Sequence, residues 1–148
     1  MEFNDLIADF ATRHNVSDLV AIDGAAALDI DGIIVTIVAR EDVLNFSAEI
    51  GEPPAEGAGV FANLLLEANM QSGAFFAKVP DPGQYIAVRR LQLSQVDDDA
   101  FDAALEVFVN QVETWRRLLA DFRPVAAAAA ESAATESPSL GSAGFMQV

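Results

Sequence analysis

The sequence predicts an α+β fold in which three helices flank a twisted, antiparallel sheet of five to six strands. The expected order is helix, three strands, helix, two strands, helix. Two Asp-Gly pairs, Asp23-Gly24 and Asp31-Gly32, supply the positive φ angles that type I′ hairpin turns require. Residues 43–50 alternate apolar and polar side chains, which is typical of a half-buried antiparallel strand. Residues 101–122 repeat apolar side chains at the spacing of a long amphipathic helix.

The first element is an amphipathic helix at the start of the chain. Its apolar positions follow the i, i+3, i+4, i+7, i+8, i+11 rule and are Phe3, Leu6, Ile7, Phe10, Ala11 and His14. Residues 19–22 are expected to form a short strand. Residues 25–30 and the β-branched run 33–40 are expected to form two more, which leads into the alternating strand 43–50. The first half is therefore a helix followed by a meander of three or four strands.

The segment AGVFANLLLEANM, residues 58–70, is a helix that is apolar on two sides. One stripe consists of Val60, Phe61, Leu64, Leu65 and Ala68, and the other carries Ala62, Leu66 and Met70, with Asn63 and Glu67 on the flank. A helix of this kind needs two surfaces to bury against. One is expected to be the sheet of the same chain and the other a second copy of the protein, with a dimer interface formed by Ala62, Asn63, Leu66 and Met70. The alternative is a helix enclosed within one monomer, and the periodicity does not say which stripe faces which surface.

The second half is expected to form a hairpin and a long helix. The strands AFFAKV and YIAVRRLQL flank the turn Pro80–Gly83. The alternation slips at Arg89-Arg90, which predicts a β-bulge there and two solvated edge charges. Asp97-Asp98-Asp99 supplies acidic capping residues for the long helix. One domain is expected over residues 1–124, followed by an Ala- and Ser-rich tail, residues 125–148, that is predicted to be disordered.

Composition narrows the function classes. The chain of 148 residues has a formal net charge of −15 and a hydrophobic fraction of 52%, with a mean hydropathy of +0.28. An acidic surface argues against nucleic acid and anionic membranes as partners; it suits basic polypeptide segments, or serves solubility alone. There is no cysteine, no signal peptide is evident, and no apolar run reaches the roughly 20 residues that span a bilayer. These features predict a soluble cytoplasmic protein.

The sequence offers no recognisable catalytic, cofactor-binding or metal-binding set. Its one histidine, His14, lies at the apolar boundary of the first helix and is expected to have a capping or packing role. Asp29-x-Asp31-Gly32 resembles the middle of a calcium loop, but Ala27 and Val38 would occupy its first and twelfth positions and cannot supply ligands. No pair among the 23 acidic residues stands out for acid–base chemistry. We therefore expect a protein that is not an enzyme.

Four sequence motifs follow one another along the chain: the opening F-x-x-L-I-x-x-F-A, the Asp-Gly turn before IIVTIV, the segment LLLEAN before a glycine-containing turn, and the closing F-x-x-A-L-E-x-F-V-N-x-x-E-x-W. In this order they resemble the class I type III secretion chaperones of the Tir chaperone (CesT-like) family. The resemblance covers Phe3 to about Phe122. It implies a small acidic cytoplasmic homodimer, without cofactor or reaction, that binds the N-terminal segment of a secreted effector and keeps it soluble and secretion-competent. It also implies that the middle helix is the dimer element.

Apolar side chains of the first helix and the neighbouring strands are the predicted contacts with such a partner. They are Phe3, Ile7, Phe10, Val35, Ile37 and Phe46, which could line grooves between helix and sheet for an extended segment. The alternative is that they are ordinary core residues. Two other functions stay open at this point: a same-fold regulator or assembly factor outside secretion, and a small-ligand-binding α+β domain.

Overall fold

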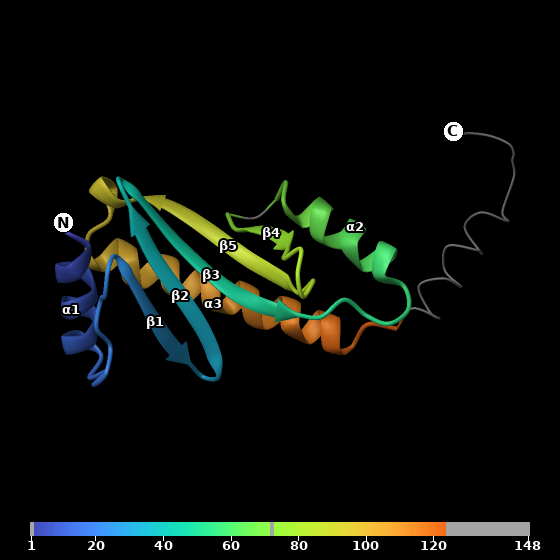
Figure 1. The fold of residues 1–148 in the computed structure, drawn as a ribbon, viewed down its shortest axis with the longest axis horizontal. Coiled ribbons are helices and arrows are strands. Elements are labelled where there is room, and N and C mark those ends of the chain that lie inside the picture. The colour runs from blue at the N-terminus through green and yellow to red at the C-terminus, as the bar shows by residue number, and fades with distance from the viewer. Residues whose placement is uncertain (1, 72, 124–148) are drawn as a thin grey trace, which may run out of the picture.

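The computed structural model describes residues 2–71 and 73–123, and it confirms the predicted α+β fold (Figure 1). The helices are α1 (Phe3–Arg13), α2 (Ala58–Ala68) and α3 (Asp98–Ala120). The strands are β1 (Ala25–Ile30), β2 (Ile33–Arg40), β3 (Val43–Gly51), β4 (Phe75–Lys78) and β5 (Tyr85–Gln92). A single 3₁₀ turn, Leu93–Gln95, leads from β5 to α3. The predicted tail, residues 125–148, lies outside the described residues.

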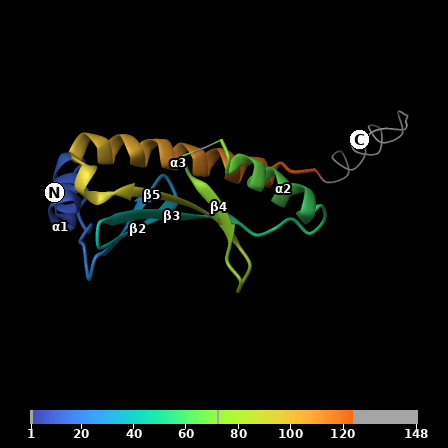
Figure 2. The same cartoon turned by 90° about the horizontal axis from the view of Figure 1, so that it is seen from above.

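The five strands form one antiparallel sheet in the order β1-β2-β3-β5-β4. All three helices lie on the same side of this sheet (Figure 2). Helix α3 runs along the sheet, and α1 lies near the start of α3. Helix α2 lies beside β4, near the end of α3 (Figures 1 and 2). The opposite face of the sheet carries no helix among the described residues. The protein therefore has one covered and one open sheet face.

The hydrophobic core lies between the covered face and α1 and α3. Phe46 of β3 stands at its centre and is fully buried. Its ring meets Phe101 edge to face at 5.6 Å between centroids and lies 5.8 Å from Phe108. Such aromatic pairs add about 0.5–1.5 kcal/mol to the stabilisation that burial itself gives. The long apolar stripe of α3 therefore packs on the middle of the sheet, as the sequence predicts.

The two Asp-Gly pairs form turns, but only one of them joins two strands. Asp31 and Gly32 have φ angles of 52° and 86° and form the two-residue connection between β1 and β2, as predicted. Asp23 and Gly24 also have positive φ angles, 54° and 76°. Ile22, which comes just before this pair, forms only an isolated bridge with Ala25, the first residue of β1. The short strand predicted over residues 19–22 is therefore absent, and the sheet has five strands.

The β-bulge predicted at Arg89-Arg90 is wrong. Strand β5 pairs with β3 without interruption through both arginines, and the irregularity lies in β3, between Glu49 and Gly51. Arg90 is exposed, but Arg89 is half-buried on the core side of the sheet. Gly73 makes room for it, because a Cβ atom at that position would lie 2.5 Å from Nη1 of Arg89. The alternation of apolar and polar residues slips in β5 because a cation, Arg89, lies on the covered face of the sheet, beside Gly73.

Candidate functional site

Helix α2 presents one apolar face to the core and another to solvent. Phe61 and Leu65 are buried, with exposed fractions of 1% and 5%. Leu66, one position further, is 63% exposed, and Met70 is 90% exposed. The helix ends at Ala68, two residues before its predicted end, so Met70 lies in the turn that follows. The structure thus buries Phe61 and Leu65 of one predicted stripe and leaves Leu66 and Met70 of the other in solvent. Leu64, which the sequence places with Phe61 and Leu65, is also exposed, at 42%.

Side-chain contacts fix the position of α2. Its C-cap residue Asn69 accepts a hydrogen bond from the backbone N–H of Phe76 at 2.7 Å and donates one to the carbonyl oxygen of Phe76 at 3.3 Å, which ties the helix end to β4. At the other end, the ring of Phe61 meets Trp115 and Phe122 of the α3 region edge to face, at 5.9 and 5.3 Å. These contacts on the buried side of α2 hold the helix in place, and they thereby fix the direction in which its exposed face points.

A mostly apolar hollow of about 360 Å³ lies beside this exposed face, and we call it the α2 hollow. Its lining comprises Pro53, Ala58, Gly59, Ala62, Leu65, Leu66, Phe76, Ala77, Lys78 and Tyr85. Of the predicted dimer residues, Ala62 and Leu66 line the hollow, whereas Asn63 and Met70 are exposed and do not line it. Sequence reasoning missed the residues from β4, β5 and the loop before α2, because helical periodicity does not say which strand a helix packs on.

The six predicted partner-binding residues lie together, but inside the core. Phe3, Ile7 and Phe10 of α1 are 1–7% exposed. The three sheet residues Val35, Ile37 and Phe46 are fully buried. Their side chains occupy the covered face of the sheet, where α1 and α3 pack on them, so in the single chain they line no open groove. This is the ordinary-core arrangement that the sequence left open, and contact of these residues with a partner stays a prediction.

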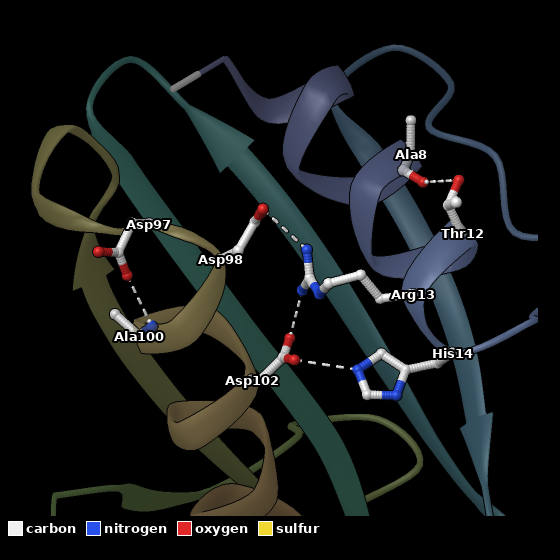
Figure 3. Close-up of polar contacts among 8 residues, drawn as sticks. All are labelled: Ala8, Thr12, Arg13, His14, Asp97, Asp98, Ala100 and Asp102. Carbon is white, nitrogen blue, oxygen red and sulfur yellow. Dashed lines mark hydrogen bonds and ion pairs between the residues drawn. The ribbon is translucent and has the colours of Figure 1, made fainter.

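A charged cluster joins the end of α1 to the start of α3 (Figure 3). Arg13 reaches Asp98 at 2.9 Å and Asp102 at 2.6 Å, and Nε2 of His14 lies 3.0 Å from Asp102. The hydrogen bond from Arg13 to Asp102 raises the pKa of Arg13 above its ordinary value. The ring of His14 also packs on Phe10, at 4.4 Å between centroids. The histidine therefore has a packing and pairing role, and the cluster acts as a clamp between two helices.

Helix α3 begins with the acidic cap that the sequence predicts. The side chain of Asp97 accepts a hydrogen bond from the backbone N–H of Ala100 at 2.8 Å (Figure 3). Asp98 and Asp99 follow in the first turn, where the helix dipole favours negative charge. Asp98 serves twice, since it also pairs with Arg13.

Replacement of Asp102 by asparagine is expected to destabilise the chain, because it removes the anion that Arg13 and His14 share. Both partners are partly exposed, so the loss should shrink as salt screens the pairs, with a Debye length of about 10 Å at 0.1 M and about 3 Å at 1 M. Urea unfolding at the two salt concentrations measures it. Glu106→Gln is the matched control: it makes the same charge change at an exposed position of the same helix. If Asp102→Asn and Glu106→Gln lower the free energy of unfolding by the same amount at both salt concentrations, the cluster does not act as a clamp.

The predicted hairpin at Asp29-x-Asp31-Gly32 is present in place of a calcium loop. The side chain of Asp29 accepts a hydrogen bond from the Gly32 N–H at 2.9 Å, which is a turn contact. Over residues 2–71 and 73–123, no group of three or more His, Cys, Asp or Glu side chains could hold a metal ion. In the same ranges, no helix has the length and apolar character needed to cross a membrane.

Solved structures share this fold. The chain is similar to a protein in the crystal structure of the ExsC-ExsE complex, with a TM-score of 0.69 and 24% identity over 78% of this chain and 92% of that one. It is also similar to a chain in the structure of the Yersinia pestis type III secretion chaperone SycH with a stable fragment of YscM2, with a TM-score of 0.63 and 17% identity over 77% and 99%. A third similar structure is YbjN, a putative transcription regulator from E. coli, with a TM-score of 0.57 and 19% identity over 76% and 87%.

The arrangement of three helices on one face of a five-stranded antiparallel sheet is thus the fold of the type III secretion chaperones. The chain belongs to the Tir chaperone protein (CesT) family, because the model of that family matches residues 5–116. A comparison with curated proteins finds no match. The family is one of chaperones, and structural neighbours are complexes of such proteins with their partners.

Proposed function

We propose that this chain is a cytoplasmic chaperone that works as a homodimer and binds the N-terminal segment of a type III secreted effector, keeping it soluble and secretion-competent. The observation that carries the proposal is the family match over residues 5–116. No reaction is needed for this role, because binding alone hides apolar segments of a client that would otherwise aggregate.

The exposed face of α2 supports the homodimer. Leu66 and Met70 are large apolar side chains that the single chain leaves in solvent, and Leu66 lines the α2 hollow. In a two-fold symmetric dimer, each copy offers both a projecting side chain and a hollow, so one patch serves both sides. Small residues such as Gly59 and Ala62 on this face let two helices approach closely. We place the interface at Ala62, Asn63, Leu66 and Met70.

The edge of the sheet and the charge of the chain support client binding. Strand β1 is an edge strand, and along its outer side no strand of the described residues pairs with it. An extended polypeptide can add to such an edge through main-chain hydrogen bonds. The net charge of −15 favours clients with basic segments and helps to keep the complex soluble.

Co-purification from the native cell tests the proposal. The tagged chain is expected to bring down a secreted protein encoded by a neighbouring gene, and to lose it when the N-terminal segment of that protein is deleted. Capture that survives the deletion would contradict binding through the N-terminal segment. Failure to capture any secreted protein, from cells that produce the secretion system, would contradict the chaperone role.

A same-fold regulator is the second candidate, because the fold also occurs in a protein described as a putative transcription regulator. The charge of −15 argues against direct contact with nucleic acid. A regulator of this fold would therefore act by binding another protein. Genes of a secretion system beside the gene for this chain favour the chaperone, whereas their absence favours the regulator.

A further inference from the structure

Strands β2 and β3 separate within the sheet. Their pairing runs from Arg40 and Val43 at the turn to Thr36 and Ser47, and no pairing is present beyond that point in these fully described strands. Yet β2 continues to Ile33, paired with β1, and β3 continues to Gly51, paired with β5. We call the unpaired stretch, residues 33–35 of β2 and 48–50 of β3, the β2–β3 fork. Figure 1 shows the two strands diverging, with α3 behind the opening.

The fork offers backbone groups on both sides. Along a strand, successive residues direct their N–H and C=O groups alternately to the two neighbouring strands. The groups of residues 33–35 and 48–50 that do not face β1 or β5 therefore face the fork, and of these the carbonyl oxygen of Glu49 already accepts a hydrogen bond from Arg116. A segment inserted there could form hydrogen bonds with two strands, whereas a segment added to the outer side of β1 has only one neighbour.

A hollow of about 500 Å³ lies at the fork. Ile34 and Ile86 contribute apolar surface to it, and Ile34 is 56% exposed. The hydroxyl groups of Thr36 and Ser47 stand where the two strands part. Pairing places Ile86 directly opposite Glu49 on the open face of the sheet. The lining thus has an apolar patch next to polar groups, which suits a strand with alternating side chains.

Arg116 of α3 supplies a positive charge to this hollow. Its Nε donates a hydrogen bond to the backbone carbonyl oxygen of Glu49 at 2.9 Å, within the part of β3 that β2 no longer pairs. Among the described residues, Arg116 forms no ion pair. Most lysines and arginines of the described residues share this property, since only Arg13 and Arg117 form ion pairs; Arg116 is the one that lines the hollow at the fork. The guanidinium group is a matching contact for an incoming carboxylate.

We propose that the β2–β3 fork binds an extended segment of the client polypeptide as an inserted strand. The segment pairs with the backbone of β2 and β3, lays an apolar side chain on Ile34 and Ile86, and sets an aspartate or glutamate beside Arg116. The proposal deepens the proposed function and rests on it for the identity of the client, but the binding mode can be tested without any client.

The probe is a blocked nonapeptide in which valine alternates with threonine around one central aspartate, with a second peptide that has lysine in its place. Titrated into the full isotope-labelled chain, the aspartate peptide is expected to shift the NMR signals of backbone amides 33–35 and 48–50. The lysine peptide should bind about twofold to fivefold more weakly, the effect of one exposed charge pair. Arg116→Gln should remove most of this difference between the peptides. Fork amides that do not shift, or shifts confined to β1, would overturn the proposal.

Single cysteines give a matched blocking control, since the chain has none of its own. Ile34→Cys treated with N-ethylmaleimide fills the fork and should abolish the peptide-induced shifts. Val43→Cys treated in the same way should not, because Val43 is 40% exposed on the same open face, but lies where β2 and β3 stay paired. Equal loss in both labelled variants would contradict insertion at the fork.

Other occupants of the fork have distinct signatures. Amides of residues 33–35 and 48–50 that face the fork, and not those bonded to β1 or β5, carry this test. If they are already protected from hydrogen exchange in the free chain at low concentration, the fork is assigned to the chain's own residues 124–148. Protection that grows with protein concentration would assign it to a second copy. Either result overturns client insertion. Peptide binding at the fork without capture of a secreted protein would contradict the proposed function alone, and capture with an unshifted fork would contradict this inference alone.

Discussion

Replacement of Phe108 by alanine is expected to lower the free energy of unfolding by about 3–5 kcal/mol, the usual cost of deleting a fully buried phenylalanine ring. Phe108 is 0% exposed and lies where α3 crosses the sheet, 5.8 Å from the ring of Phe46. Domains of this size are stable by about 5–15 kcal/mol, so the loss would consume a large part of the total. Urea denaturation followed by the fluorescence of Trp115, the only tryptophan, measures it.

Val107→Ala is the matched control for this prediction. Val107 precedes Phe108 in the same helix but is 47% exposed. Its replacement leaves the core intact, and alanine is the better helix former, so the free energy of unfolding should change by no more than about 0.5 kcal/mol. Similar losses in both variants would mean that the covered face of the sheet is not the centre of the core.

The order of elements could be predicted because local signals agree with the fold. Asp31 and Gly32 carry the turn chemistry that a two-residue hairpin demands, and the structure gives both of them positive φ angles. Asp97 caps the long helix as its position before an apolar stripe indicates. In these places a few neighbouring residues determine the backbone conformation, so the local structure can be predicted from a single sequence.

Tertiary contacts could not be predicted in the same way. Arg89 breaks the alternation of β5, and the sequence alone cannot show that Gly73, distant along the chain, leaves space for it on the covered face. Likewise, the apolar pattern of Ile7 or Phe46 looks the same whether the residue lines a groove or fills a core. Only the packing of α3 on the sheet decides between these, and it puts both residues in the core.

For α2, the two-sided apolar pattern separates Leu65 from Leu66, but it places the exposed Leu64 with the buried stripe and does not show what covers the outer face. Leu65 and Leu66 are adjacent in sequence, yet one is 5% and the other 63% exposed. This contrast permits a test of the dimer with two neighbouring leucines and the same substitution.

Leu66→Asp is expected to convert a homodimer into folded monomers. A carboxylate at this position would be buried without a partner in the interface, and a two-fold dimer would contain two of them. A penalty of about 3–5 kcal/mol raises the dissociation constant about 100-fold or more. Size-exclusion chromatography with light scattering should show a mass that falls from twice the chain mass of 15.7 kDa to a single chain mass, while circular dichroism stays unchanged.

Two further variants make this result specific to the outer face of α2. Leu65→Asp should unfold the chain, because Leu65 packs in the core of the monomer. Ile22→Asp should leave a dimer: Ile22 is as exposed as Leu66, at 66%, but lies next to β1, at the edge of the sheet opposite β4 and α2. An unchanged dimer with Leu66→Asp would refute the assignment of the α2 face, and a wild-type chain that is monomeric at all concentrations would refute the homodimer itself. If Leu66→Asp gives folded monomers while Leu65→Asp unfolds the chain and Ile22→Asp leaves a dimer, the exposed side of α2 must contact a second copy.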